Sequence, residues 1–117
     1  MSEELKARTK AYAHRCIDLA LALPDTDLGR LIRRQRLRCG SSVAANYRAA
    51  SRAKSTADFV SKLGTVEEEA DESLFWMEIV MEREILQSLR VRPLHQEGAE
   101  ILSIVIASIK TARQGER

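Results

Sequence analysis

The sequence predicts an all-α fold, an antiparallel up-down-up-down four-helix bundle formed by a single domain over residues 1–117. Apolar residues recur at steps of three and four along most of the chain, which is the period of an amphipathic helix. Aromatic residues make up only 4%, and Val, Ile and Thr never alternate with polar residues as they do in strands. The two prolines and five glycines provide few turns, so the connections between helices are short.

The first helix is predicted from about Glu3 to Leu23, and Pro24 ends it because proline biases the preceding residue away from helical backbone angles. Its apolar face consists of Leu5, Tyr12, Cys16, Leu19 and Leu23. The second helix follows the cap-forming segment 25–27 and runs from about Leu28 to Ala53. Its thinner apolar face consists of Leu28, Leu31, Ile32, Cys39, Val43, Tyr47 and Ala50.

Ser55 is predicted to cap the third helix, and Asp58 three residues later has the spacing of a capping box. The helix is expected to run to about Gln87. Its apolar stripe consists of Phe59, Leu63, Val66, Ala70, Leu74, Met77 and Met81. The segment SLRVRPL, which contains Pro93, is predicted to form the next turn.

The fourth helix is predicted from about Leu94 to Arg113 and is apolar around most of its circumference. Its apolar residues are Ile101, Leu102, Ile104, Val105, Ile106 and Ile109. A helix of this kind is buried on more than one side, whereas each helix of a monomeric bundle has an outer face. The pattern therefore favours a subunit interface and a homo-oligomer.

Cys16 and Cys39 lie among apolar or small residues, so we expect buried free thiols in a reducing compartment. The first residues, MSEELKARTK, are charged and contain no apolar signal region. The longest apolar run, ILSIVIASI, is far shorter than the ~20 residues of a membrane span. These features predict a cytoplasmic protein without a membrane partner.

Charge is distributed unevenly, although the formal net charge is only +2. Residues 1–54 carry 12 Lys/Arg against 5 Asp/Glu, residues 55–88 carry 2 against 9, and residues 89–117 carry 5 against 3. No acidic residue lies between Asp27 and Asp58, and eight basic residues do. A basic run of this kind is an electrostatic footprint for the phosphate groups of RNA or DNA.

The candidate nucleic-acid contacts are Arg30, Arg33, Arg34, Arg38, Arg48, Arg52 and Lys54. The chain has no aromatic platform for unpaired bases and no RRM-, KH- or zinc-type signature, so we expect contacts to backbone and shape. The alternative is a helix face whose arginines pair with the acidic run VEEEADE. We expect ion pairs, within or between subunits, of Arg30, Arg33, Arg34 and Arg38 with Glu67, Glu68, Glu69, Asp71 and Glu72.

No catalytic residue, cofactor or metal site is predicted. Di-iron bundles carry Glu-x-x-His on two helices, and neither His14 nor His95 has a glutamate three residues before it. His14 and Cys16 are two residues apart on one helix and therefore point in different directions. No glycine-rich phosphate loop occurs, so we expect a non-enzymatic protein.

The segment 37–76 carries a family pattern. Arg38, Ser42 and Asn46 form Arg-x-x-x-Ser-x-x-x-Asn, followed by Arg52, by Ser55-x-x-Asp58-Phe59, and by Leu63 with the acidic run. In these motifs and in its order of helices the chain resembles the 23S rRNA intervening-sequence protein family. Common members have Ser-Ile-Pro-Ser-Asn and then Ala-Glu-Gly. This chain has Ser-Val-Ala-Ala-Asn and then Tyr-Arg-Ala-Ala, so it resembles a divergent, more basic branch.

The resemblance implies a homopentamer of four-helix bundles arranged as a barrel. It also implies a relation to the accessory variability determinant of diversity-generating retroelements, a basic pentamer that partners a reverse transcriptase and binds nucleic acid. RNA or DNA, and a protein partner such as a reverse transcriptase, are therefore the expected partners. Two hypotheses follow: an oligomeric module that binds RNA or DNA through a basic surface, and a protein-interaction scaffold or accessory subunit with no nucleic-acid binding of its own.

The segment 40–54 is expected to combine close packing with a charged rim. Asn46 is predicted to be a buried polar residue bonded to a neighbouring backbone, while Arg48, Arg52 and Lys54 project from the end of the second helix. The small residues that allow close packing are Gly40, Ser41, Ser42, Ala44, Ala45, Ala49 and Ala50. The residues with a structural polar role are Ser42, Asn46, Ser55 and Asp58.

Overall fold

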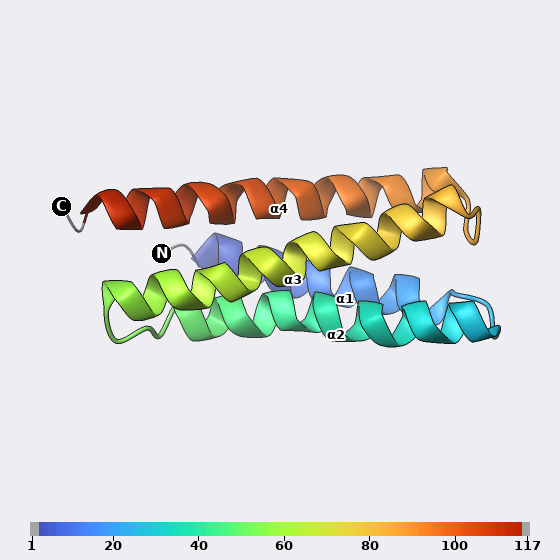
Figure 1. The fold of residues 1–117 in the computed structure, drawn as a ribbon, viewed down its shortest axis with the longest axis horizontal. Helices are drawn as coiled ribbons and strands as arrows, with labels where there is room; N and C mark the ends of the chain where they lie inside the picture. The colour runs from blue at the N-terminus through green and yellow to red at the C-terminus, as the bar shows by residue number, and fades with distance from the viewer. Residues whose placement is uncertain (1–2, 116–117) are drawn as a thin grey trace.

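The computed structural model describes residues 3–115 and contains four antiparallel helices (Figure 1). They are α1 (Glu3–Leu21), α2 (Asp27–Ala50), α3 (Thr56–Glu82) and α4 (Ser88–Gly115). Each helix packs on the next, and α1 contacts α4 less than the helices that follow one another in the chain contact each other. The predicted all-α four-helix bundle is therefore confirmed. Within residues 3–115, no helix is long and apolar enough to cross a membrane.

The first two helices end slightly earlier than predicted. After Leu21 the chain forms short turns, although Leu23 stays buried in the core. At the end of α2, the N–H of Arg52 donates to the Ala49 carbonyl and that of Ala53 to the Ala50 carbonyl. Bonds of this i→i+3 type tighten the chain at a helix terminus, so the last predicted residues of α2 form turns.

Helix α3 ends at a left-handed backbone conformation that glutamate rarely adopts. Glu84 has φ 53°, and the N–H of Ile85 donates to the carbonyl of Val80 at 2.9 Å. A residue with a left-handed backbone conformation, followed by a hydrogen bond that reaches back five residues, is the Schellman motif that ends many helices. Glycine normally fills that position, and here Glu84 does. For this reason the end of α3 was predicted at Gln87, five residues too late.

The prediction that SLRVRPL forms a turn is wrong, because α4 begins at Ser88 and contains Pro93. Proline removes one helix hydrogen bond, which here would join its nitrogen to the carbonyl of Leu89. Both residues are exposed, so water can satisfy that carbonyl. Val91 and Leu94 are buried on the opposite face, and their burial holds this turn in the helix.

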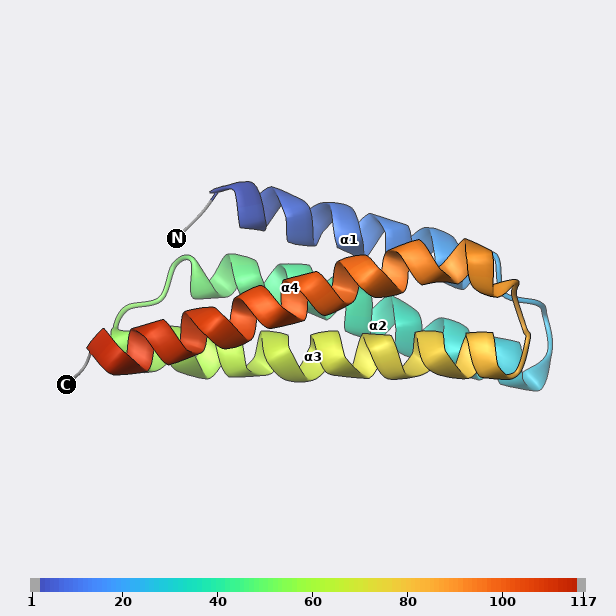
Figure 2. The ribbon, with the colours of Figure 1, turned by 90° about the horizontal axis from the view of Figure 1, so that it is seen from above.

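The separation between α1 and α4 changes along the bundle (Figure 2). The start of α4 lies beside the end of α1, and the two helices separate toward the N-terminal end of α1. A groove of about 700 Å³ lies along this separation and is lined by Leu5, Tyr47, Phe59 and Ile104, among others. The groove leaves part of the apolar surface of α4 without an intramolecular partner.

Glycines bring the helices into close contact at two points of the core. A β-carbon at Gly40 on α2 would lie 2.5 Å from the β-carbon of Cys16 on α1, and one at Gly98 on α4 would lie 2.5 Å from the Tyr12 hydroxyl. Neither distance is sterically possible. The predicted close packing of the small-residue segment is thus confirmed at Gly40.

Candidate nucleic-acid interface

Two of the candidate arginines are bound at the connection between α1 and α2. Arg30 forms ion pairs with Asp25 at 2.7 Å and with Asp27 at 2.6 Å. Arg33 donates hydrogen bonds to the carbonyls of Ala20 and Leu23 and so closes the end of α1. These arginines hold the turn together, and two hydrogen bonds of each are already made there.

Arg38 alone among the four predicted arginines pairs with the acidic run. Its Nη2 lies 2.6 Å from Glu72 Oε1, and its Nη1 lies 3.4 Å from Glu69 Oε1. Within one chain, Arg30 and Arg33 bind the α1–α2 turn instead of the acidic run of α3. Arg34 is exposed and forms no ion pair within residues 3–115, so pairing of these three arginines with the acidic run stays a prediction for contacts between subunits.

The structure contains a buried arginine that the list of candidates omits. Arg36 is fully buried, and its Nη1 donates to the Ser73 carbonyl at 2.7 Å. Its Nε and Nη2 have no hydrogen-bond partner among the described residues. The signal was present in the sequence, since Arg36 lies on the apolar stripe of α2 between Ile32 and Val43 at helical spacing.

A small polar cluster surrounds this guanidinium. The hydroxyl groups of Tyr12 and Ser73 share a hydrogen bond of 2.7 Å, and the Ser73 hydroxyl also donates to the Ala70 carbonyl. Burial raises the pKa of the Tyr12 hydroxyl, and it raises the pKa of the Cys16 thiol while the charge of Arg36 opposes the rise. All these groups are enclosed in the bundle and cannot contact a macromolecule.

Arg48, Arg52 and Lys54 form a different environment, which we call the basic end. All three are exposed, and their side chains form no ion pair or hydrogen bond within residues 3–115. The connection between α2 and α3 lies at the same end of the bundle as the C-terminal end of α4 (Figure 1). Lys54 and Ser55 line one shallow hollow together with Ala112 of α4.

Helix α4 adds charge to this end, which the candidate residues on α2 did not indicate. Lys110 and Arg113 lie in its last turns and are exposed, also without an ion pair in the described part of the chain. They line a second hollow that includes Glu67. They could not be assigned from spacing, since they are more than fifty residues from Lys54 and only the packing of α4 on α3 places them there.

The predicted structural polar residues are local to their own helices. Asn46 is only half-buried, and its Nδ2 donates to the carbonyl and the hydroxyl of Ser42 at 2.9 and 2.7 Å. It therefore bonds its own helix instead of a neighbouring one. The Ser55 cap is confirmed, because its hydroxyl accepts a hydrogen bond from the Asp58 N–H at 3.1 Å.

Asp58 completes the start of α3. Its carboxylate accepts a hydrogen bond from the Lys54 backbone N–H at 3.1 Å and pairs with Lys62 at 2.5 Å. The bond from Lys62, and then the one from the Lys54 N–H, hold the pKa of Asp58 below its usual range. The carboxylate of Asp58 is thus already paired, and Arg48 and Arg52 have no ion pair within residues 3–115.

Both cysteines are free and buried, as predicted. Burial first, and then the charge of Glu72, raise the pKa of the Cys39 thiol to about 12. A thiol that holds its proton so firmly is a poor nucleophile. Of the two histidines, His14 is exposed and His95 pairs with Glu78 at 2.9 Å.

The arrangement defines a class of protein, an antiparallel four-helix bundle in which Arg30 and Arg38 of α2 are ion-paired and the end of α2 is basic and exposed. The chain belongs to the 23S rRNA-intervening sequence protein family, whose family model matches residues 3–107. A solved structure of a protein of unknown function from the S23 ribosomal protein family of Bacteroides thetaiotaomicron is similar, with 30% identity and a TM-score of 0.85. The match covers 91% of this chain and 98% of that chain. No curated protein matches the chain significantly.

Proposed function

We propose that the protein is a non-enzymatic, oligomeric module that binds RNA or DNA through the basic end. The observation that carries this proposal is the set of exposed cations at one end of the bundle that have no ion pair within residues 3–115: Arg48, Arg52 and Lys54, with Lys110 and Arg113 of α4 beside them. Cations that are not paired with these residues are available to phosphate groups. Neutralising them with a nucleic acid releases counterions and makes binding dependent on salt.

The contacts proposed are to phosphates and to the shape of the nucleic acid. The one large aromatic side chain that is exposed in residues 3–115 is Phe75, on the acidic part of α3. At the described part of the basic end the aromatic side chain is Phe59, which is half-buried in the hollow beside Lys54, so a fully exposed platform for base stacking is missing there. We expect similar affinity for RNA and DNA stem-loops of different sequence.

Assembly into a homo-oligomer, a pentamer by family resemblance, forms part of the proposal. Ile104 and Ile106 of α4 are 37% and 47% exposed, and the groove beside α1 is mainly apolar in its lining residues. Packing these surfaces against another copy would remove them from water. A ring of copies would also repeat the basic end and raise avidity for a long polyanion.

Sedimentation equilibrium of the full chain tests the assembly. The expected mass is about five times the 13.2 kDa of one chain. The double substitution Ile104→Glu/Ile106→Glu should yield smaller species, because it places charge in the proposed interface. A wild-type chain that remains monomeric at micromolar concentration would contradict this part of the proposal.

The second candidate function is a scaffold that binds another protein, such as a reverse transcriptase, and no nucleic acid of its own. Phe75 favours it, because this side chain is 51% exposed and aromatic residues are enriched at protein–protein interfaces. In this case the basic end would attract acidic surfaces of the partner. The two functions differ in whether the isolated protein binds nucleic acid at physiological salt.

Fluorescence anisotropy of a labelled RNA stem-loop and of a labelled DNA duplex tests the proposal. We expect sub-micromolar binding at ~150 mM salt, and a loss of at least tenfold in affinity for Arg48→Ala/Arg52→Ala/Lys54→Ala. The matched control, Lys6→Ala/Lys10→Ala/Arg15→Ala, removes the same charge from α1. An equal loss of affinity in both variants would show that only the net charge of the protein matters, and would contradict a site at the basic end. If the wild type binds no nucleic acid even at low salt, the scaffold function is the one that stands.

A further inference from the structure

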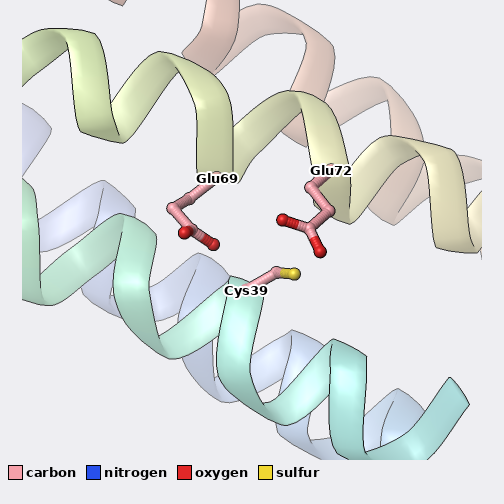
Figure 3. Close-up of side chains that lie close together, drawn as sticks. All are labelled: Cys39, Glu69 and Glu72. Atoms are coloured by element: carbon pink, nitrogen blue, oxygen red, sulfur yellow. The ribbon is translucent and has the colours of Figure 1, made fainter. Parts of the chain in front are cut away.

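The cluster that carries a further inference lies between α2 and α3, away from the basic end. Cys39 projects from α2 toward Glu69 and Glu72, which lie about one turn apart on α3 (Figure 3). The Sγ of Cys39 and one carboxylate oxygen of each glutamate all lie within 4.8 Å of one another. Three possible metal ligands on two packed helices are thus already close together.

A cation already lies against all three ligands. The guanidinium of Arg38 places Nη2 2.6 Å from Glu72 Oε1 and 3.8 Å from Cys39 Sγ, and Nη1 3.4 Å from Glu69 Oε1. The Arg38 side chain is 54% exposed. Because its stem is flexible and solvated, Arg38 can leave the cluster without disturbing the core.

One carboxylate oxygen of the cluster has no hydrogen-bond partner among the described residues. Cys39 is fully buried, and Glu69 Oε2 is buried with no hydrogen bond from any described residue. The Glu69 side chain is only 15% exposed. A buried carboxylate oxygen without a donor is costly, and coordination to a cation would remove that cost.

We propose that Cys39, Glu69 and Glu72 bind a thiophilic divalent metal ion of the Zn²⁺ class in exchange for Arg38. One metal–sulfur and two metal–oxygen bonds form, the thiol proton passes to water, and water fills the fourth position. The donor set of one thiolate and two carboxylates suits Zn²⁺, whose bonds to sulfur and oxygen are about 2.3 and 2.0–2.2 Å long. Mg²⁺ and Ca²⁺ prefer oxygen ligands alone.

Titration of the full chain with Cd²⁺ tests the proposal, because a thiolate bound to Cd²⁺ gives an ultraviolet charge-transfer absorption that free Cd²⁺ lacks. We expect this absorption to saturate at one metal ion per chain. It should be lost in Cys39→Ser and retained in the matched control Cys16→Ser, whose thiol lies in the other buried cluster. Zn²⁺ should displace Cd²⁺ and abolish the absorption.

Two further variants address the ligands when Cys39→Ser fails to fold. Glu69→Gln/Glu72→Gln keeps the thiol and should weaken Cd²⁺ binding at least tenfold, whereas Arg38→Ala should strengthen it several-fold by removing the competing cation. No charge-transfer absorption in the wild type would overturn the proposal. Absorption that depends on Cys16, or that is unchanged in the double glutamine variant, would overturn it equally. None of these results depends on nucleic-acid binding.

Discussion

Both ends of α2 carry basic side chains, but the surroundings of these side chains differ. At the first end, Arg30, Arg33 and Arg38 are bound to carboxylates or carbonyls, and Arg36 is buried in the core. At the other end, Arg48 and Arg52 are exposed and have no ion pair in residues 3–115. The number of arginines in a segment therefore says little about its function until the surface opposite each one is known.

The difference has a simple structural cause. The first half of α2 lies between α1 and the acidic part of α3, so Arg33 meets carbonyls at the α1–α2 turn and Arg38 meets carboxylates on α3. Arg34 in the same half is exposed and has no ion pair within residues 3–115. The last turn of α2 faces the start of α3, where the acid Asp58 is already paired with Lys62. The charges of Arg48 and Arg52 are therefore available to a binding partner.

The largest expected effect on stability tests how tightly the first part of α2 is packed. Gly40→Ala places a β-carbon 2.5 Å from that of Cys16, so we expect the free energy of unfolding to fall by about 2–3 kcal/mol. Urea denaturation followed by circular dichroism measures it.

The matched control for Gly40→Ala lies on α3. A β-carbon at Gly64 has no atom within 4 Å, so Gly64→Ala should raise the free energy of unfolding by about 0.5–1 kcal/mol. Equal effects of the two substitutions would contradict the close contact of α1 and α2.

A smaller effect is expected for the buried arginine. Arg36→Met keeps a long side chain in the core and removes two buried donors that have no partner. We expect the free energy of unfolding to rise by about 1 kcal/mol, because an uncompensated buried charge is costly. Denaturation by urea compares it with Arg34→Met, an exposed control expected within about 0.5 kcal/mol of the wild type. A loss above about 2 kcal/mol would mean that Arg36 stabilises the bundle.

The smallest effect extends the comparison to a paired charge outside α2. Arg8 hydrogen-bonds Glu97 at 2.6 Å between α1 and α4 and holds the pKa of that carboxyl below its usual range. Stability from a lowered pKa is present above the unfolded pKa of about 4.3 and is lost as pH falls through the folded value. Glu97→Gln should thus cost about 0.5–1 kcal/mol at pH 7 and nothing near pH 2. Thermal unfolding across this range measures it, and a cost that persists in acid would contradict the ion pair.

The features that sequence reasoning predicted are those with local signals. The four helices, the Ser55 cap and the buried thiols follow from apolar spacing and residue type, and the family pattern lies within forty residues. The start of α4 was missed because the burial of Val91 outweighs the signal of Pro93. Tertiary packing decided that outcome.

The candidate site could be predicted only in part, for a related reason. Arg48, Arg52 and Lys54 were assigned correctly as exposed, since they lie in the last turn of α2 or just after it. The partners of Arg30 and Arg33 depend on how α1 turns into α2, and the position of Arg113 depends on the packing of α4. None of these relations is encoded in the spacing of residues within one helix.

The most direct test of the difference between the ends of α2 is the salt dependence of nucleic-acid affinity for two charge-matched variants. For Arg48→Ala/Arg52→Ala, the slope of log affinity against log salt should become shallower by about 1.4–1.8, as two phosphate contacts are lost. For Arg30→Ala/Arg38→Ala, which removes the same charge from paired positions, the slope should equal that of the wild type. Equal changes of slope in both variants would contradict the account, because the paired and unpaired arginines would then contribute alike.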